Sequence, residues 1–378
     1  MVYKKILIVF GTRPEALKMI PLVKKLSLET SFKTKVCVTG QHRDMLDQVL
    51  KTFNVVPDFD LNLMTKNQTL SSLTNKILDG FQTLLNKFKP DLVFVHGDTT
   101  TTFATSLSCF YNRIRVAHVE AGLRTYNLMS PWPEEFNRQI TSKISFLHFA
   151  PTAKSKANLV NENVAEESII VTGNTIIDTL FMGLDIIDKN KLQNQIIKTF
   201  KFNFSNKIIL ITAHRRENFG QGFLNICSSI KKLSKKYPDA NFVYPVHLNP
   251  NVKNVVMEEL KKIKNIFLIK PLEYLEFIFL MSKSYIILTD SGGVQEEAPS
   301  LNKPVLVMRN TTERPEAVAH GKVKLVGTNQ IKIINEVSSL MDNESYYKSF
   351  LKKANPYGDG KASEKIVKYL KNKLYVQS

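Results

Sequence analysis

"KKILIVFGTRPEALKMIPLVKKL", residues 4–26, joins a short apolar run to an amphipathic segment through a polar turn. The apolar run is rich in Ile and Val, which is typical of a strand that is buried on both faces. After the turn, the apolar side chains from Ala16 to Val23 recur at helical spacing, and Pro14 suits a first helical turn. The stretch therefore predicts a buried strand followed by a helix, the repeating unit of a parallel sheet.

The same pattern recurs along the chain in two series. Further apolar runs of the first series are "DLVFVH" (91–96), "RVAHV" (115–119) and "FLHFA" (146–150). A second series follows "IIVTGNT" and comprises "KIILITA" (207–213), "NFVYPV" (241–246), "IFLI" (266–269), "YIILT" (285–289) and "PVLVM" (304–308). Continuous apolar runs separated by amphipathic segments predict parallel sheets that are covered by helices on both faces.

The two series predict an α/β protein built from two Rossmann-like, doubly wound domains that face a central cleft. We expect the first domain to span residues 1–170 and the second to span residues 171–358. "NPYGDGK" precedes a last amphipathic segment, so residues 359–378 are expected to form a helix that packs back on the first domain. The length of 378 residues agrees with two domains, because it exceeds what one hydrophobic core usually organises.

The net charge of +18 admits nucleic acid, an anionic membrane or anionic substrates as partners. The lysines are spread through amphipathic segments without aromatic interleaving or a basic tail, which favours solvated helix faces over a nucleic-acid surface. No run approaches the ~18 apolar residues of a membrane span, and the first apolar run is too short for a signal segment. We therefore expect a cytoplasmic protein that binds no nucleic acid and does not insert into membranes.

Three cysteines, Cys37, Cys109 and Cys227, are widely scattered in apolar surroundings. Because an odd, unclustered set forms no disulfide framework, we expect reduced thiols in the core. Neither the cysteines nor the seven histidines show metal-ligand spacing such as CxxC or HExxH, so no protein-bound metal is expected.

Three acidic side chains follow predicted strands of the first domain. Asp98 lies in "HGDTTTT", Glu120 in "HVEAGLRT" and Glu134 in "SPWPEEFNRQ". Asp98 taken alone is also explained as a helix cap. Because the loops after parallel strands meet at one edge of a sheet, we expect the three carboxylates to converge on one cleft, where they can act as general acids and bases.

Basic side chains follow other predicted strands. Arg13 follows the first strand in "FGTRPE", where the dinucleotide fingerprint GxGxxG is missing, so we expect a phosphate held by an arginine rather than NAD. In the second domain, His214 and Arg215 follow one strand in "TAHRREN", and His247 follows the next in "YPVHLNP". These residue types favour an anionic ligand.

The stretch "LTDSGGVQEEAPS" predicts a strand end that turns into a helix. Ser291, Gly292 and Gly293 lie at the expected helix start, where free N–H groups and the helix dipole suit a diphosphate. Glu297, one turn further on, can accept hydrogen bonds from ribose hydroxyls, whereas Glu296 has no predicted role beyond structure. The predicted ligand is a nucleoside diphosphate that carries a sugar.

Ten motifs, in chain order, resemble those of the bacterial non-hydrolysing UDP-N-acetylglucosamine 2-epimerases. They are "FGTRPEA", "TGQHRDML", "VHGDTTTT", "HVEAGLRT", "SPWPEEFNR", "TGNT", "TAHRREN", "YPVHLNPNV", "LTDSGGVQEEAPS" and "RNTTERPEAV". The resemblance runs from about residue 4 to about residue 360. It implies a glycosyltransferase-B type fold, a homodimer, and the interconversion of UDP-GlcNAc and UDP-ManNAc, which supplies ManNAc units for cell-surface polysaccharide.

The implied reaction can be compared with the residues present. The C2 proton of the sugar is not next to a carbonyl, so its direct abstraction by a carboxylate would face a very large barrier. Transient oxidation would need NAD, whose fingerprint is missing. The alternative expels UDP from C1 as the C2 proton leaves, and then re-adds UDP to the resulting 2-acetamidoglucal with protonation on the opposite face. We therefore expect no cofactor.

By motif position, the resemblance implies catalytic roles for Asp98 and Glu134 near C2, for Glu120 in support, and for His214 at the departing diphosphate. It does not say which carboxylate is the acid and which is the base. The implied UDP-binding residues are Arg13, His214, Ser291, Gly292, Gly293 and Glu297, with the uracil near Phe277. An activating second substrate site, known in some members, would use Gln41, His42, Glu134, Arg215 and His247, although Asn67 stands where some members carry an arginine.

Four alternatives remain open at the level of the sequence. A glycosyltransferase of the same fold would share the Gly292–Glu297 stretch but would not need three carboxylate loops. A hydrolysing 2-epimerase would release free ManNAc and UDP, and an epimerase of a UDP-diacetamido-uronic acid would want a further cation. A nucleotide-sugar sensor would leave the carboxylates without a purpose.

Overall fold

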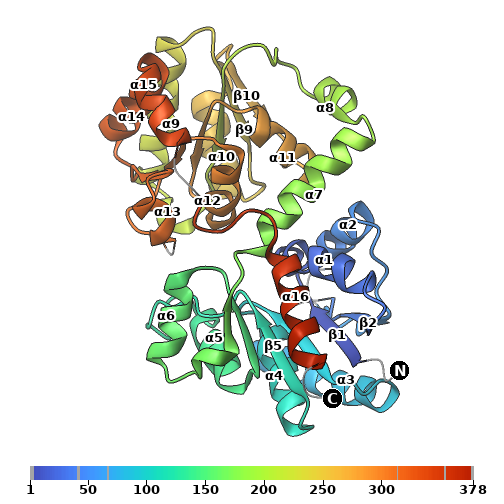
Figure 1. The fold of residues 1–378 in the computed structure, drawn as a ribbon. Helices are drawn as coiled ribbons and strands as arrows, with labels where there is room; N and C mark the ends of the chain where they lie inside the picture. Colours follow the sequence, from blue (N-terminus) through green and yellow to red (C-terminus); the bar gives the residue numbers. More distant parts are fainter. Residues whose placement is uncertain (1–3, 41–42, 66–67, 313, 353–354, 376–378) are drawn as a thin grey trace. The chain divides into compact units, whose positions relative to one another are not determined.

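A computed structural model describes residues 4–40, 43–65, 68–312, 314–352 and 355–375. The chain divides into two compact units, each described here by itself (Figure 1). Unit 1 comprises Met1–Thr179 and Tyr357–Ser378, and unit 2 comprises Leu180–Pro356. The last helix thus belongs with the first half of the chain.

Unit 1 contains a seven-stranded parallel sheet with the strand order β3-β2-β1-β4-β5-β6-β7. The strands are β1 (Lys4–Phe10), β2 (Phe32–Val38), β3 (Phe59–Asp60), β4 (Leu92–His96), β5 (Arg115–Val119), β6 (Leu147–Ala150) and β7 (Ile169–Val171). The helices are α1 (Arg13–Ser27), α2 (Arg43–Thr52), α3 (Leu70–Lys87), α4 (Thr100–Tyr111), α5 (Glu134–Ile144), α6 (Ala153–Asn161), the 3₁₀ turn η1 (Glu166–Ser168) and α16 (Ala362–Tyr375). Helix α7 (Thr175–Lys189) begins in unit 1 and ends in unit 2.

Unit 2 contains a six-stranded parallel sheet with the strand order β10-β9-β8-β11-β12-β13. The strands are β8 (Ile208–Thr212), β9 (Asn241–Pro245), β10 (Ile266–Ile269), β11 (Ile286–Thr289), β12 (Val305–Val307) and β13 (Val323–Leu325). The helices and 3₁₀ turns are α8 (Gln193–Thr199), η2 (Arg216–Asn218), α9 (Gln221–Lys236), α10 (Pro250–Leu260), α11 (Tyr274–Lys283), α12 (Gly292–Glu297), η3 (Ala298–Leu301), α13 (Pro315–Ala319), α14 (Gln330–Asp342) and α15 (Glu344–Leu351).

The two strand orders confirm the predicted fold class of two Rossmann-like, doubly wound units. In each sheet the order reverses once, between β1 and β4 in unit 1 and between β8 and β11 in unit 2. Open parallel sheets bind ligands outside the carboxyl ends of the strands at such a switch point. The loops that follow these four strands are therefore where a functional site is expected.

The first strand-turn-helix unit is fixed by its own sequence. The Ile6–Phe10 part of β1 is buried, and Thr12 caps α1 by accepting a hydrogen bond from the N–H of Glu15. The Glu15 carboxylate in turn accepts from the N–H of Thr12, which completes a capping box. Proline lies in the first turn of α1, as the sequence predicts.

The C-terminal helix α16 packs against α1 of unit 1. Its first N–H groups have no acceptor within the helix, and the Asp178 carboxylate accepts hydrogen bonds from Ala362 at 3.1 Å and Ser363 at 2.8 Å. A carboxylate at a helix N-terminus is also favoured by the helix dipole. Asp178 thereby ties the end of the chain to the start of α7.

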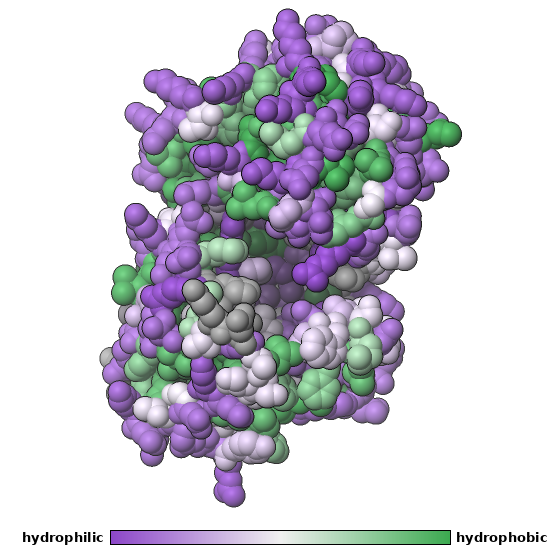
Figure 2. Space-filling view, turned by 180° about the vertical axis from the view of Figure 1, so that it is seen from behind, coloured by the Kyte–Doolittle hydropathy of each residue, from purple (hydrophilic) through white to green (hydrophobic). Residues whose placement is uncertain are grey.

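The hydrophobic core of each unit contains the sheet strands, and the three cysteines lie within these cores as free, buried thiols. Burial raises the pKa of each thiol, that of Cys227 to about 12. The face drawn in Figure 2 is mostly hydrophilic, with scattered hydrophobic patches. Within the described ranges, the structure has no helix that is long and apolar enough to span a membrane.

Gly122 allows the loop after β5 to pass close to α6. Its φ is +92°, and a Cβ there would lie 2.2 Å from the carbonyl oxygen of Ser155. We expect Gly122→Ala to destabilise unit 1 by roughly 2 kcal/mol or more, because it adds a backbone clash to left-handed strain. Thermal unfolding followed by the fluorescence of Trp132, the only tryptophan and a residue of unit 1, measures this loss.

The matched control for this prediction is Gly40→Ala. Gly40 is also in unit 1 and has a φ of +67°, but its nearest new contact would be at an ordinary 3.5 Å. It should lower the unfolding temperature less than Gly122→Ala does. Equal effects would contradict the steric argument.

Candidate active site

Unit 1 gathers polar and charged side chains at the carboxyl ends of β1, β4 and β5. The Glu15 carboxylate, at the start of α1, accepts hydrogen bonds from the N–H groups of Gly11 and Thr12 and from the Thr99 hydroxyl at 2.7 Å. It therefore joins the loop after β1 to the loop after β4, on the two sides of the switch point. Burial raises the pKa of Glu15, and the hydrogen bonds from Thr99 and Thr12 oppose that shift.

Asp98 lies in the loop after β4 and pairs with an arginine. Arg138 of α5 donates to its carboxylate at 2.7 Å, and the side-chain amide of Asn137 donates to its backbone carbonyl at 2.9 Å. The cap of α4 is Thr99, so helix capping does not explain Asp98. Its side chain remains 28% exposed, which leaves the carboxylate accessible to a ligand.

The charge environment of Asp98 favours its protonated form more than water does. Burial raises its pKa, the Arg138 guanidinium lowers it, and the neighbouring Glu120 carboxylate raises it again. The net shift is upward, toward neutral pH. A carboxyl group tuned in this direction suits proton transfer better than an ordinary aspartate does.

Glu120 follows β5 and lies within a buried cluster of polar groups. Lys18 of α1 donates to it in an ion pair, and the Asn174 side chain donates to it at 2.7 Å. His96 Nε2 is 3.8 Å from the other carboxylate oxygen. Glu120 also has a positive φ of 62°, a left-handed conformation that costs a non-glycine residue about 1–2 kcal/mol. Such strain is often retained at functional sites.

Glu134 is placed differently from the other two predicted carboxylates. It is the first residue of α5 and is half-buried, and within the described residues its carboxylate has no hydrogen bond or ion pair. Its neighbour Glu135 is fully buried instead, accepting from the N–H groups of Thr125 and Tyr126 and pairing with Arg138 at 3.2 Å. Glu135 thus orders the preceding loop, while Glu134 is left available.

In unit 2, two of the predicted basic residues, His214 and Arg215, contact Asp290 at the second switch point. His214 follows β8, and its ring stacks on that of His247 after β9, with centroids 5.3 Å apart. The Nδ1 atom of His214 is 3.5 Å from a carboxylate oxygen of Asp290, which is completely buried after β11. Arg215 donates its backbone N–H to the same carboxylate at 2.8 Å. Burial lowers the pKa of His214, and Asp290 opposes that shift.

The "SGGVQEE" stretch forms the short helix α12 that was predicted after β11. Ser291 is its N-cap, and the N–H groups of Gly292 and Gly293, in the first turn, have no acceptor within the helix. The Glu297 carboxylate accepts from the Tyr274 hydroxyl at 2.7 Å. Glu296, which had no predicted role, is buried and pairs with Arg314 at 2.9 Å.

Two further residues predicted to bind UDP lie on helices. Arg13 is the first residue of α1 and is half-buried, and Phe277 lies half-buried on α11. Gln41 and His42, predicted for a second substrate site, lie outside the described residues, as does Asn67. In the described part of the chain, no group of three or more His, Cys, Asp or Glu is arranged to hold a metal ion.

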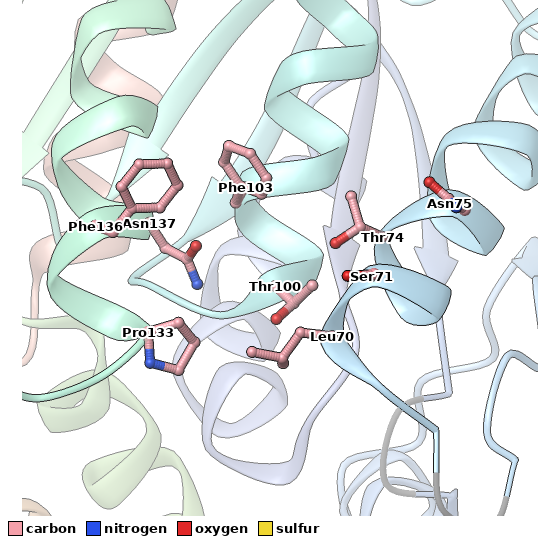
Figure 3. Close-up of a pocket in the computed structure, with 9 residues that line it drawn as sticks. All are labelled: Leu70, Ser71, Thr74, Asn75, Thr100, Phe103, Pro133, Phe136 and Asn137. Carbon is pink, nitrogen blue, oxygen red and sulfur yellow. The ribbon is translucent and has the colours of Figure 1, made fainter. Parts of the chain in front are cut away.

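A separate cavity of about 340 Å³ lies in unit 1 among α3, α4 and α5 (Figure 3). Figure 3 shows the rings of Phe103 and Phe136 lining it from α4 and α5, and their centroids are 5.7 Å apart. Asn137, which binds the backbone of Asp98, also lines it. None of the described carboxylates does, so the cavity adjoins the charged cluster rather than containing it.

Several residues of these clusters were not predicted from the sequence. They are Glu15, Lys18, Glu135, Arg138, Asn174 and Asp290. Glu15 had a visible signal, the capping-box spacing of "TRPE". Lys18 and Arg138 resemble the solvated basic residues of any amphipathic helix, and only the tertiary structure shows that they are buried beside carboxylates.

Two Rossmann-like units, each with its polar residues at a switch point, define the chain as an α/β protein of the glycosyltransferase-B type, the fold of its solved relatives. Comparison with known proteins identifies a particular family within this fold class. The sequence model of the family "UDP-N-acetylglucosamine 2-epimerase" matches residues 24–371, and the chain belongs to that family.

Individual relatives are similar over almost their full length. The UDP-N-acetylglucosamine 2-epimerase of Campylobacter jejuni is 56% identical over 372 residues, covering 97% of each chain. That of Escherichia coli K12 is 54% identical over 370 residues, covering 97% of this chain and 98% of the relative. The crystal structure of the Neisseria meningitidis enzyme bound to UDP-GlcNAc has a TM-score of 0.90 and 54% identity, covering 97% of this chain and 100% of that one.

The buried histidines of unit 1 supply a prediction on pH. Burial lowers the pKa of His118 to about 3, and its Nε2 lies 2.7 Å from the carbonyl oxygen of Gly97. The unfolded chain takes up a proton on His118 near pH 6.5, whereas the folded chain does not, so this residue's contribution to stability is lost as the pH falls below 6.5. The loss should be about 1 kcal/mol per pH unit down to about pH 4.

The variant His118→Gln isolates this contribution, because glutamine can donate to Gly97 but does not titrate. Carboxyl groups with raised pKa values, such as Asp98, act in the opposite direction, but they are common to both proteins. Urea unfolding at several pH values measures the free energy of unfolding of both proteins. The value for the variant should rise relative to that of the wild type as the pH falls from 6.5 to 4. Parallel pH profiles would show that His118 does not titrate as described.

Proposed function

We propose that the protein interconverts UDP-GlcNAc and UDP-ManNAc by inverting C2 of the sugar. Family membership and the name shared by relatives above 50% identity support this activity. The substrate is supported by the Neisseria meningitidis enzyme, which is 54% identical and was solved with UDP-GlcNAc bound. The ManNAc product would supply cell-surface polysaccharide.

The observation that carries the proposal is the pair of carboxylates at the ends of β4 and β5. Asp98 and Glu120 are close enough to influence each other's charge, and they are paired with different cations, Asp98 with Arg138 and Glu120 with Lys18. Carboxylates in this position fit acid–base chemistry better than ligand binding alone, which would leave them without a chemical purpose. Asp98, whose pKa is raised by burial and by the Glu120 carboxylate, is suited to proton transfer at C2 of the sugar, with Glu120 in support.

The proposed reaction has two halves. A carboxylate removes the C2 proton, its C–H electron pair forms the C1–C2 double bond, and the C1–O bond breaks with its electrons leaving on UDP. The bound 2-acetamidoglucal then takes a proton at C2 from the opposite face while a UDP oxygen re-forms the bond to C1. We assign the proton transfers to Asp98 and Glu134, in either order, and a supporting role to Glu120. The half-buried Glu134, which has no ion pair within the described residues, remains available for this purpose.

Unit 2 would bind UDP. The first-turn N–H groups of Gly292 and Gly293, together with Ser291, suit the diphosphate, and Glu297 suits the ribose. We further assign Arg13 and His214 to the diphosphate and the surroundings of Phe277 to the uracil.

No NAD is needed in this scheme. In a dinucleotide site, the N–H groups of the loop after the first strand hold the pyrophosphate, but here the Glu15 carboxylate accepts from the N–H groups of both Gly11 and Thr12. An anion placed there would also face this carboxylate at close range. The absence of the glycine fingerprint from the sequence supports the same proposal.

Three further assignments come from the resemblance to the family. We propose a cytoplasmic homodimer with an activating substrate site that includes Glu134, Arg215 and His247, together with Gln41 and His42. The stacking of His247 on His214 supports a link between such a site and the diphosphate. Equilibrium binding of UDP-GlcNAc with more than one site per chain would support the activating site.

Incubation with UDP-GlcNAc in heavy water tests the reaction. The expected product, followed by NMR, is UDP-ManNAc with deuterium at C2, because the transferred proton exchanges with solvent. Free ManNAc with UDP would instead indicate a hydrolysing enzyme, and no change in the sugar would contradict an epimerase. An isotope label on the oxygen that joins C1 to the diphosphate provides a further readout. If the C1–O bond breaks and re-forms, this label should also appear in the non-bridging oxygens of the same phosphate.

The variant Asp98→Asn tests the role of its carboxylate. We expect turnover to fall by at least about 1,000-fold, because an amide cannot transfer the proton, while the affinity for UDP stays within about threefold. Calorimetry with UDP and the deuterium assay measure the two quantities. The control, Asp79→Asn, changes an exposed aspartate on α3 of the same unit and should leave both unchanged. A parallel loss of UDP binding in Asp98→Asn would indicate a structural role.

A further inference from the structure

His214 and Asp290 are brought together by the strand order of unit 2. Strands β8 and β11 are neighbours in the sheet, with Thr212 opposite Thr289, so the residues just beyond their ends share the switch point. Asp290 is completely buried, whereas the His214 side chain is 38% exposed. The carboxylate is therefore shielded from solvent, whereas the imidazole beside it remains partly accessible to a ligand.

The two oxygens of the Asp290 carboxylate have different surroundings. Oδ2 accepts hydrogen bonds from the backbone N–H groups of His214 and Arg215, each at 2.8 Å, and from the Asn218 side chain at 3.2 Å. Oδ1 is buried, makes no hydrogen bond among the described residues, and faces His214 Nδ1 at 3.5 Å. A buried anionic oxygen without a donor is costly, and the Nδ1–H of His214 is the group placed to satisfy it.

The ring stacked on His214 has the opposite proton arrangement. Nδ1 of His247 accepts a hydrogen bond from the N–H of Asn249 at 3.1 Å, so the ring N–H of His247 lies on Nε2. Of the groups around His214, Asp290 favours a cationic ring, and His247 and Arg215 oppose one.

We propose that Asp290 is a positioning residue for His214: it holds one ring proton on Nδ1 and balances the charge of the imidazolium, so that Nε2–H donates to the departing diphosphate. The inference rests on the proposed function for the identity of the anion. When UDP binds, the ring takes up its second proton from solvent at Nε2. As the C1–O bond breaks, UDP gains a negative charge, and the donor and the positive ring stabilise it at that moment.

The same carboxylate links the chemistry to the loop that bears His214. Because Oδ2 is held by two backbone N–H groups, Asp290 fixes the position of the loop while Oδ1 fixes the ring. An asparagine at this position could still accept those backbone hydrogen bonds. Its NH₂ group would then face Nδ1, which would have to accept, and the ring would lose its counter-ion and remain neutral with its proton on Nε2.

The experiment compares wild type with Asp290→Asn, using UDP as the probe. In protein labelled with ¹⁵N-histidine, long-range ¹H–¹⁵N spectra of the UDP complex should show both nitrogens of wild-type His214 protonated. The signal is assigned by its loss in His214→Gln. In Asp290→Asn the ring should be neutral, with the proton on Nε2. The kcat for epimerisation should fall by about 100-fold or more, and KM should change much less.

The control is Asn218→Ala, which removes a donor to Oδ2 and leaves Oδ1 in place. It should lower kcat by less than about tenfold and leave the His214 spectrum unchanged. If it matches Asp290→Asn, then Asp290 acts only by anchoring the loop and the inference is overturned. A wild-type His214 without a proton on Nδ1 in the UDP complex overturns it as well, even if Asp290→Asn does not fold.

The outcomes also separate this inference from the proposed function. If wild-type His214 shows the expected protonation with UDP but the protein forms no UDP-ManNAc, the proposed function fails and the positioning of His214 stands. If UDP-ManNAc forms while Asp290→Asn keeps its kcat within tenfold, the positioning role fails and the function stands.

Discussion

Compensation of buried charge is the constraint on which the rest of unit 1 depends. Glu120 is buried with Lys18, and Asp98 shares Arg138 with the fully buried Glu135. Removing one partner from such a pair leaves the other charge buried and uncompensated in a medium of low dielectric. The resulting loss of stability is far larger than the net contribution of the intact pair. The packing of α1 and α5, which carry these cations, is therefore required to compensate the charge of the carboxylates.

The two units share one structural arrangement at the switch point but place different chemical groups in it. In each, the loops that follow the two strands at the switch point are tied by one carboxylate: Glu15 joins the loops after β1 and β4, and Asp290 joins those after β8 and β11. In unit 1 the tied loops carry acids with cations behind them, and in unit 2 they carry a histidine with an acid behind it. Each unit thus has a supporting charge opposite in sign to the group it supports.

Much of this architecture was predictable, because buried parallel strands have a strong sequence signal. The strands without a predicted counterpart were β2, in which lysines and a threonine interrupt the apolar residues, β3, with two residues, β7, with three, and β13, whose three residues include a lysine. Asp98 and Glu120 could be singled out because they directly follow apolar runs. Asp290 also directly follows an apolar run, but the histidine that it supports is set by strand order and not by local spacing. Lys18 and Arg138 carry no such signal, because helix packing decides which side chains lie opposite them.

The three thiols have a practical consequence for studying this chain. Because Cys37, Cys109 and Cys227 are buried and their pKa values are raised, they hold almost no thiolate at neutral pH and are shielded from reagents. The natural sequence is therefore already a background for site-specific labelling. A cysteine introduced on the surface of each unit would take up a spin label or fluorophore selectively, and distances between the two labels could be followed as nucleotide is added.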